Sequence, residues 1–304
     1  MKTFYFMAGL PRAGSTLLST LLNQNPRIYS GPSSPVLGTM YATHDSFITN
    51  ELYTGYPKPD QVNEIIGSVI EHWYSDIDKP VVIDKNRAWC AKVPFIEGYI
   101  KQEAKIIVPV RRIDEILASI LTMIKRNPFK EGQPRINFVD EQLVKFDIPI
   151  NDENRCQYLL SNRGGIVWES LNATKLGVEE GHSDKFHYVD YNNLVKDPQN
   201  QLNLIYEFLG EEPFEHTFDN LSNQYREDDI TTYGLGDMHE VHSKLEKVST
   251  DPSKILPASI IELYNHNKSN LEFWHHSGIV DTQSKIATSP VPIDPKSKTY
   301  NLFS

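Results

Sequence analysis

Short apolar runs alternate with amphipathic stretches along most of the chain. The runs have the length and composition of strands buried in a parallel sheet, and they are Phe4–Met7, Pro80–Asp84, Ala104–Val110 and Phe186–Tyr191. Between and after them, apolar residues recur at helical spacing over 60–74, 113–126, 153–171 and 198–209. This alternation predicts an α/β protein with a doubly wound fold, in which helices cover both faces of a central parallel sheet.

Two long segments lack such patterns. Residues 126–152 and 210–256 are rich in polar and turn-forming types, so we expect surface loops or lids there. The end of the chain carries Pro290, Pro292 and Pro295, which is typical of an extended segment. We therefore expect a single domain over residues 1–282 and an extended tail over 283–304.

Composition and charge exclude several classes of protein. The 304 residues carry a formal net charge of −10, whereas nucleic-acid binding relies on an excess of Lys and Arg. No apolar run reaches the roughly 18 residues that a membrane span needs, and the first run begins almost at the N-terminus, without a targeting segment. Cys90 and Cys156 form neither a disulfide framework nor a zinc motif. We expect a cytoplasmic protein without a metal.

The segment after the first apolar run has the pattern of an anion-binding loop. Gly9 and Gly14 let the backbone turn so that successive N–H groups point inward, and a leucine-rich helical stretch begins at Ser15. The helix N-terminus adds unsatisfied donors and the positive end of the helix dipole. This order predicts a phosphate or sulfate site. The alternative is an ordinary Gly-Pro turn in which Arg12 is solvated.

The loop departs from a nucleotide-triphosphate loop at one position. Ser15 stands where G-x-x-x-x-G-K-[ST] has its lysine, and the cation lies instead at Arg12, where a guanidinium can clamp two oxygens. This pattern resembles the 5′-phosphosulfate loop of sulfotransferases that use 3′-phosphoadenosine 5′-phosphosulfate (PAPS). The resemblance implies a P-loop-like fold and a PAPS site that includes Pro11, Arg12, Ala13, Gly14, Ser15 and Thr16.

A second segment resembles the 3′-phosphate site of the same family. Arg111 follows an apolar run, and Ser119 comes eight residues later, so the two side chains can converge on one small anion. Arg112 is the alternative to Arg111, because the family often has Asn-Pro after its arginine and this chain has Arg112-Ile113. Taken alone, the pair also fits a surface basic pair and an ordinary helix serine.

Two further segments resemble cofactor-binding parts of the family. The stretch around Tyr191 resembles the segment whose tyrosine lies at the adenine, where a ring offers a stacking face and a hydroxyl. Asp197-Pro198 and Gly210 in the same stretch are a helix start and a helix stop. Residues 243–254 faintly resemble the segment that closes over the cofactor in tyrosylprotein-type members. Ser243 or Lys254 would then contact the 3′-phosphate, although a solvated loop fits them as well.

Transfer of a sulfuryl group requires cations for its oxygens and a base for the acceptor. Lys85 matches the family's sulfuryl-contacting lysine. Neither family base is present, because the positions of the family's glutamate and histidine fall on Gly31–Ser33 and Arg87. By position alone, the candidates for the base are Asp84, His44, Asp45 and His239.

The resemblance thus implies a PAPS-dependent sulfotransferase that modifies a hydroxyl or amine of a small molecule, lipid, glycan or peptide. One alternative is a P-loop kinase or NTPase, with Thr16 and a Walker B-like Asp84 as magnesium ligands. Another is a catalytically silent nucleotide-binding module, because the family base is missing.

Overall fold

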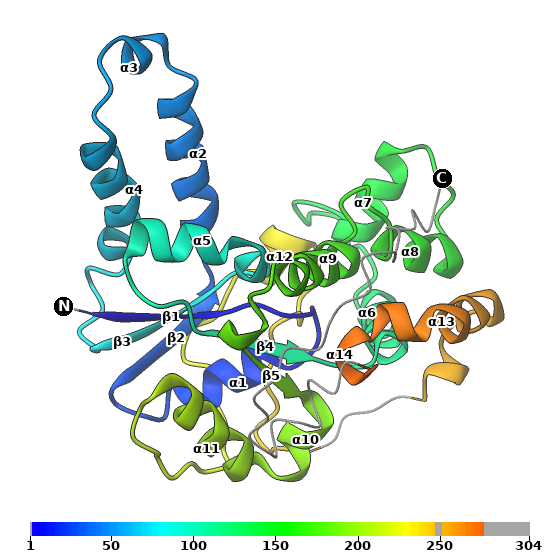
Figure 1. The fold of residues 1–304 in the computed structure, drawn as a ribbon. Helices are drawn as coiled ribbons and strands as arrows, with labels where there is room; N and C mark the ends of the chain where they lie inside the picture. Colours follow the sequence, from blue (N-terminus) through cyan, green and yellow to red (C-terminus); the bar gives the residue numbers. More distant parts are fainter. Residues whose placement is uncertain (1, 247–250, 277–304) are drawn as a thin grey trace.

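A five-stranded sheet forms the centre of the molecule (Figure 1). The structure is a computed structural model that describes residues 2–246 and 251–276. All neighbouring strands are parallel, and their order across the sheet is β2-β3-β1-β4-β5. The strands are β1 (Thr3–Met7), β2 (Ile28–Ser33), β3 (Val81–Lys85), β4 (Ile106–Val110) and β5 (Phe186–Asp190). The α/β fold with a central parallel sheet is therefore confirmed.

Strand β1 lies in the middle of the sheet and contributes to the core on both faces. Phe4 and Phe6 pack into one apolar cluster, and Tyr5 and Met7 pack into a second, because successive side chains of a strand point to opposite faces. Strands β3, β4 and β5 are buried along their whole length. Their continuous apolar character follows from this burial on both faces.

Helices cover both faces of the sheet. In the view of Figure 1, α1, α10 and α11 lie below it, and α5 and α9 lie above it. The helices are α1 (Ser15–Leu22), α2 (Val36–Ile48), α3 (Glu51–Gly55), α4 (Pro59–Trp73), α5 (Val93–Phe95), α6 (Ile113–Arg126), α7 (Phe138–Lys145), α8 (Asp152–Leu159), α9 (Ile166–Glu179), α10 (Tyr191–Lys196), α11 (Pro198–Leu209), α12 (Asp229–Tyr233), α13 (Ala258–Leu271) and α14 (Phe273–His276). Short 3-10 or π turns cover 89–92, 96–100, 183–185 and 252–254.

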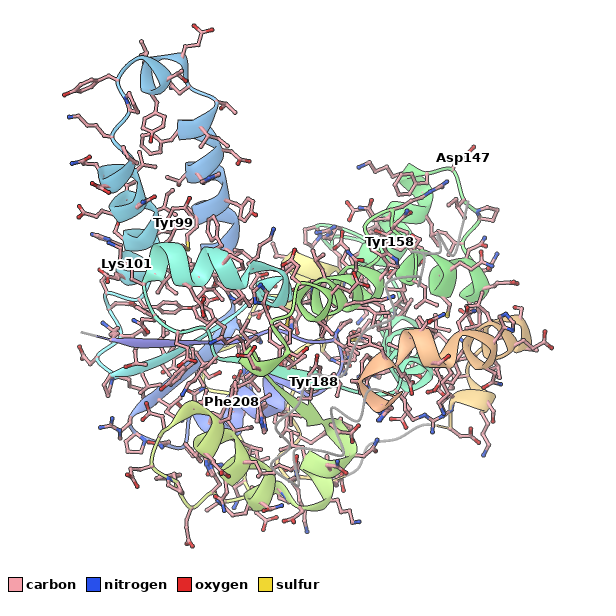
Figure 2. All side chains as sticks on the ribbon, viewed as in Figure 1. Tyr99, Lys101, Asp147, Tyr158, Tyr188 and Phe208 are labelled. Atoms are coloured by element: carbon pink, nitrogen blue, oxygen red, sulfur yellow. The ribbon has the colours of Figure 1, made fainter. Side chains whose placement is uncertain are left out.

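Two groups of helices project from the same side of the sheet (Figure 1). The first is an arm in which α2 packs against α4 and the short α3 lies at the tip. Figure 2 shows Tyr99 and Lys101 near the base of this arm. The second group is α7 and α8, where Figure 2 shows Asp147 and Tyr158. Figure 2 also marks Tyr188 in strand β5 of the sheet and Phe208 on α11 below it.

Most elements expected from the pattern are present. The stretches 60–74, 113–126 and 198–209 correspond closely to α4, α6 and α11, and Gly210 ends α11 in the left-handed conformation. The expected helix over 153–171 is wrong in its extent, because the chain breaks between α8 and α9. The break lies at Gly164 and Gly165, where a side chain at Gly165 would meet the carbonyl oxygen of Tyr158 at 2.1 Å.

The sequence pattern missed β2 and α2, and α7 lies within a segment that we expected to be a loop. Residues 210–246 and 251–256 are mostly irregular, as expected, apart from α12 and a 3-10 turn. The expected tail over 283–304 lies outside the described residues, and the single domain over 1–282 remains a prediction. Within the described part of the chain, no helix combines the length and apolar character that crossing a bilayer requires.

Candidate active site

A pocket lies at the carboxyl ends of the parallel strands. It is lined by residues that follow β1, β3, β4 and β5 and by the end of β2, because the carboxyl ends of parallel strands share one edge of the sheet. The segment 238–246, apart from Ser243, forms another wall. The order of the strands reverses around β1, which is the position where doubly wound sheets open a crevice for a ligand. The sequence-predicted residues that line this pocket are Pro11, Arg12, Gly14, Ser15, Thr16, Lys85, Arg111, Ser119, Tyr191 and His239.

Glycines allow the loop after β1 to approach its neighbours closely. Gly9 has φ +85°, and a Cβ atom there would lie 2.4 Å from the carbonyl oxygen of Pro109 in β4. Gly14 has φ +87°, and a Cβ atom there would lie 2.8 Å from the ring of Tyr191. Both positions therefore require glycine for conformation and for space. The loop is held against the strand that leads to Arg111 and against the aromatic residue after β5.

Helix α1 directs its N-terminus into this pocket. Gly14 is the N-cap, and within the described residues no side chain caps the helix. The first backbone bond within the helix runs from the N–H of Leu18 to the carbonyl of Gly14, so the preceding N–H groups have no acceptor inside the helix. Ser15 and Thr16 line the pocket, and their end of the helix can bind an anion. Ala13 does not line it, because its side chain packs into the core.

Arg12 links three segments around the pocket. Its Nε lies 3.3 Å from the Oγ of Ser119 on α6, and its Nη1 donates to the carbonyl of Met238. Burial lowers the pKa of the Arg12 guanidinium, and the charge of Arg111 lowers it further. Two cations thus lie close together in a partly buried site. An anion bound between them would relieve their repulsion, which favours a phosphate or sulfuryl group as the ligand.

Arg111 lies in the pocket, and Arg112 does not. The Arg111 guanidinium stacks 4.4 Å from the ring centre of Tyr191, its Nε donates to Glu115 at 2.9 Å, and its Nη1 donates to the carbonyl of Arg12 at 3.3 Å. These contacts fix the guanidinium in one orientation. Arg112 instead pairs with Asp114 outside the pocket. The geometry therefore brings together Arg111, Ser119 and Tyr191, as the resemblance implies.

Lys85 and Asp84 are adjacent in β3 but face different surroundings. Lys85 lines the pocket, where burial lowers the pKa of its ammonium group to about 8. Asp84 lies in the core, where its carboxylate accepts hydrogen bonds from Ser34, Tyr74 and Trp89. Burial raises the pKa of Asp84. The expectation that Asp84 is a base or a metal ligand is corrected, because three donors from the core hold it away from the pocket.

The other nominated residues occupy different places. His44 packs against Phe95 and Tyr99 at the base of the arm and pairs with the exposed Asp45, so neither residue lines the pocket. Ser243 is exposed and does not line the pocket, although His242 and Lys244 beside it do. Lys254 is exposed in a 3-10 turn that packs near α6. Only His239 among the nominated bases reaches the pocket.

Sequence reasoning missed two carboxylates beside His239. Asp229 binds the imidazole, and Glu227 lies 4.0 Å from the Nζ of Lys85. Glu227 also accepts the backbone N–H of Ser33 at 2.9 Å, across 194 positions of sequence. Ser33 ends the segment where this chain lacks the family's glutamate. The only signal in the sequence was a run of acidic residues in a polar stretch. Such a run does not indicate that these residues lie close to His239 in the folded chain.

Comparison with known proteins shows the family of this chain. The family model described as the sulfotransferase family matches residues 5–216, and the chain belongs to this family. The sulfotransferase domain from the curacin biosynthetic pathway matches 88% of this chain and 98% of its own length, with a TM-score of 0.50 and 14% identity. Mouse sulfotransferase SULT7A1, solved with PAP, matches over 94% and 90% respectively, with a TM-score of 0.50 and 12% identity. No curated protein matches the chain.

Proposed function

We propose that this sulfotransferase moves the sulfuryl group of PAPS to a hydroxyl or amine of an acceptor. The observation that carries the proposal is the meeting of three cationic side chains, Arg12, Lys85 and Arg111, at the N-terminus of α1 in one pocket. PAPS carries negative charge at both its 5′-phosphosulfate and its 3′-phosphate. A pocket with cations at separate positions suits such a ligand.

Each part of the site has a role in the proposal. The loop N–H groups and Arg12 hold the 5′-phosphosulfate, and Lys85 meets the charge that develops on the sulfuryl oxygens. Arg111 and Ser119 hold the 3′-phosphate, and Tyr191 lies beside the adenine. In the transfer, the acceptor oxygen or nitrogen forms a bond to sulfur, and the bond from sulfur to the 5′-phosphate oxygen breaks. Adenosine 3′,5′-bisphosphate (PAP) leaves with the electron pair.

The acceptor in this reaction is a small molecule, lipid, glycan or peptide. Cys90 and Cys156 are buried and form no disulfide with each other. Free cysteines of this kind favour a location in a reducing compartment such as the cytoplasm. No metal ion is required, because the three cations and the helix N-terminus can meet the charge of a single sulfuryl group. A kinase would instead need Mg²⁺ to bridge two phosphates.

Titration calorimetry with PAP, 5′-AMP and Mg-ATP tests the proposal. We expect PAP to bind most tightly, and release of PAP from PAPS should continue in excess EDTA. Tighter binding of Mg-ATP, with a phosphate transfer that EDTA stops, would replace the proposal with the kinase alternative. Tight binding of PAP without turnover of PAPS in the presence of varied acceptors would indicate a silent nucleotide-binding module.

A further inference from the structure

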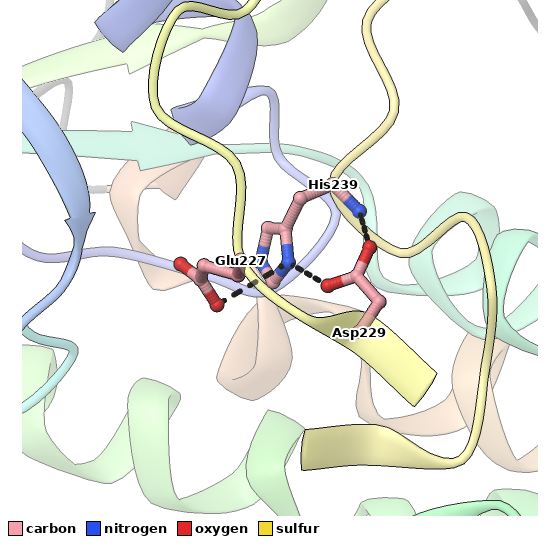
Figure 3. A group of neighbouring side chains, drawn as sticks. All are labelled: Glu227, Asp229 and His239. Atoms are coloured by element: carbon pink, nitrogen blue, oxygen red, sulfur yellow. Dashed lines mark hydrogen bonds and ion pairs between the residues drawn. The ribbon is translucent and has the colours of Figure 1, made fainter. Parts of the chain in front are cut away.

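Two carboxylates surround one nitrogen of His239 at the edge of the pocket (Figure 3). The Nδ1 atom lies 2.6 Å from Oδ1 of Asp229 and 3.4 Å from Oε2 of Glu227. The second oxygen of Asp229 accepts the backbone N–H of the same histidine at 2.8 Å. Asp229 therefore holds both the main chain and the ring of His239. Such double attachment fixes the orientation of the ring.

This attachment determines which ring nitrogen carries the proton. The short contact to a carboxylate places the proton of the neutral imidazole on Nδ1, since a carboxylate accepts and cannot donate. The Nε2 atom then carries the lone pair. Among residues 2–246 and 251–276, no hydrogen bond reaches Nε2 of His239. An oriented histidine with a free Nε2 beside a ligand pocket is suited to accept a proton.

Further contacts connect this group to the rest of the site. The carbonyl of Met238, the residue before His239, accepts a hydrogen bond from Arg12 in the phosphate loop. Glu227 accepts a hydrogen bond from the backbone N–H of Ser33 at the end of β2. Its Oε1 atom also lies 4.0 Å from the Nζ of Lys85 at the end of β3. The ring of Tyr233 also packs against His239, with 5.5 Å between ring centres. Three strand ends or loops thus fix the position of the imidazole.

We propose that Nε2 of His239 is the general base of the transfer and that Asp229 and Glu227 are its positioning residues. This inference rests on the proposed function. The hydroxyl proton of the acceptor moves to Nε2 as its oxygen forms the bond to sulfur. The bond between sulfur and the 5′-phosphate oxygen breaks, and PAP leaves with that electron pair. The imidazolium, stabilised by Asp229, then returns its proton to water.

The position of this base explains why the sequence lacks the family's own. A carboxylate from residue 227 lies against Ser33, and a histidine from residue 239 lies in the pocket beside Lys85. Both come from the segment 210–246, far from the positions where relatives carry their base. The chain thus supplies its base from the wall that covers the pocket. The charged or titratable groups near it include Asp229, Glu227, Tyr233, Lys85 and Arg87.

The test compares His239→Gln and His239→Ala with the full-length wild type. The readouts are the affinity for PAP by calorimetry and the release of PAP from PAPS, with water and with 2-naphthol as acceptors. We expect unchanged PAP affinity and a loss of turnover of about 10²–10⁴-fold in both variants. Added imidazole should restore part of the turnover of His239→Ala. Asp229→Asn should lower turnover with little change in PAP affinity, and His266→Gln, on an exposed face of α13, serves as the matched control.

Several outcomes would overturn the inference. Near-wild-type turnover of His239→Gln would exclude His239 as the general base. A loss of PAP affinity as large as the loss of turnover would exclude it as well, because the histidine would then act in binding. Absence of imidazole rescue in a folded His239→Ala protein that still binds PAP indicates a structural role. Tight binding of Mn²⁺ by the wild type, together with activity that EDTA abolishes, assigns Glu227, Asp229 and His239 to a metal instead. A wild type that binds no PAP and cleaves no PAPS refutes the proposed function itself, so the two failures are distinguishable.

Discussion

The Nε atom of Arg12 lies 3.3 Å from the Oγ of Ser119, although the two residues are 107 positions apart. This contact joins the loop after β1 to the helix after β4. The resemblance assigns Arg12 to the phosphosulfate and Ser119 to the 3′-phosphate, but the structure brings both side chains together. Arg12 therefore lies between the two ends of the site. Its guanidinium could therefore contact a bound nucleotide at the phosphosulfate or at the 3′-phosphate.

We expect Arg12→Ala to reduce both turnover of PAPS and affinity for PAP while leaving the fold intact. Loss of a charge-assisted contact to the transferring group should cost about 3 kcal/mol or more, which is roughly a hundredfold or more in rate. Steady-state kinetics with calorimetry measures both effects. Arg12→Lys keeps the charge but loses the forked donors, so it should recover only part of the loss. Near-normal turnover by a folded Arg12→Ala protein would show that Arg12 takes no part in the transfer.

Arg111→Ala should erase the preference for PAP over 5′-AMP. In the wild type we expect that preference to be about a hundredfold, which corresponds to about 3 kcal/mol from charged hydrogen bonds to the 3′-phosphate. Arg112→Ala is the matched control, since that guanidinium pairs with Asp114 outside the pocket. Calorimetry with both nucleotides gives the ratio for each protein. Equal affinity of the wild type for PAP and 5′-AMP would refute the 3′-phosphate assignment.

Asp84→Ala should destabilise the fold by about 3 kcal/mol or more, because three buried donors lose their acceptor. Urea unfolding measures the change. Asp45→Ala, at an exposed position on α2, should alter the free energy of unfolding by less than about 0.5 kcal/mol. Stabilisation by Mg²⁺ that disappears in Asp84→Ala would contradict the structural role and restore the Walker B alternative.

The sequence predicted the parts of the site that depend on local order. The glycine loop, Lys85 and Arg111 each follow a strand directly, and parallel strands place their carboxyl ends together. The apolar runs that predict these strands are buried on both faces, so their pattern is strong. Three of the four expected helices also have clear apolar stripes. The fold and the cationic half of the pocket could therefore be predicted.

The group formed by His239 and its two carboxylates could not be predicted in the same way. Glu227, Asp229 and His239 lie in a mostly irregular segment, whose path depends on tertiary contacts such as those to Ser33 and Arg12. Asp84 was misassigned because a strand-end carboxylate looks the same in sequence whether it faces the core or a ligand. Strand β2 was missed because Gly31 and Pro32 interrupt its apolar run.

Lys85 should impose a pH dependence on the turnover of PAPS. Burial lowers the pKa of its ammonium group to about 8, while the nearby charge of Glu227 opposes the shift. The cation is therefore present below pH 8 and lost above it, so turnover of PAPS should fall on the alkaline side with a midpoint near pH 8. Lys85→Arg should move this fall to higher pH, because a guanidinium stays charged. Glu227→Gln should move it to lower pH, because an opposing carboxylate is removed.

Lys85→Met should separate this catalytic role from a structural one. The unfolded chain binds the lysine proton up to its ordinary pKa of 10.5, while the folded chain releases it near pH 8, so burying the charged lysine costs stability at pH 7. Lys85→Met should therefore raise the melting temperature at pH 7 and lower turnover, with a smaller change in PAP affinity, since the cation acts on charge that develops in the transition state. A wild-type rate that stays constant from pH 7 to about 9.5, or Lys85→Met turnover equal to the wild type, would show that this cation takes no part in the transfer.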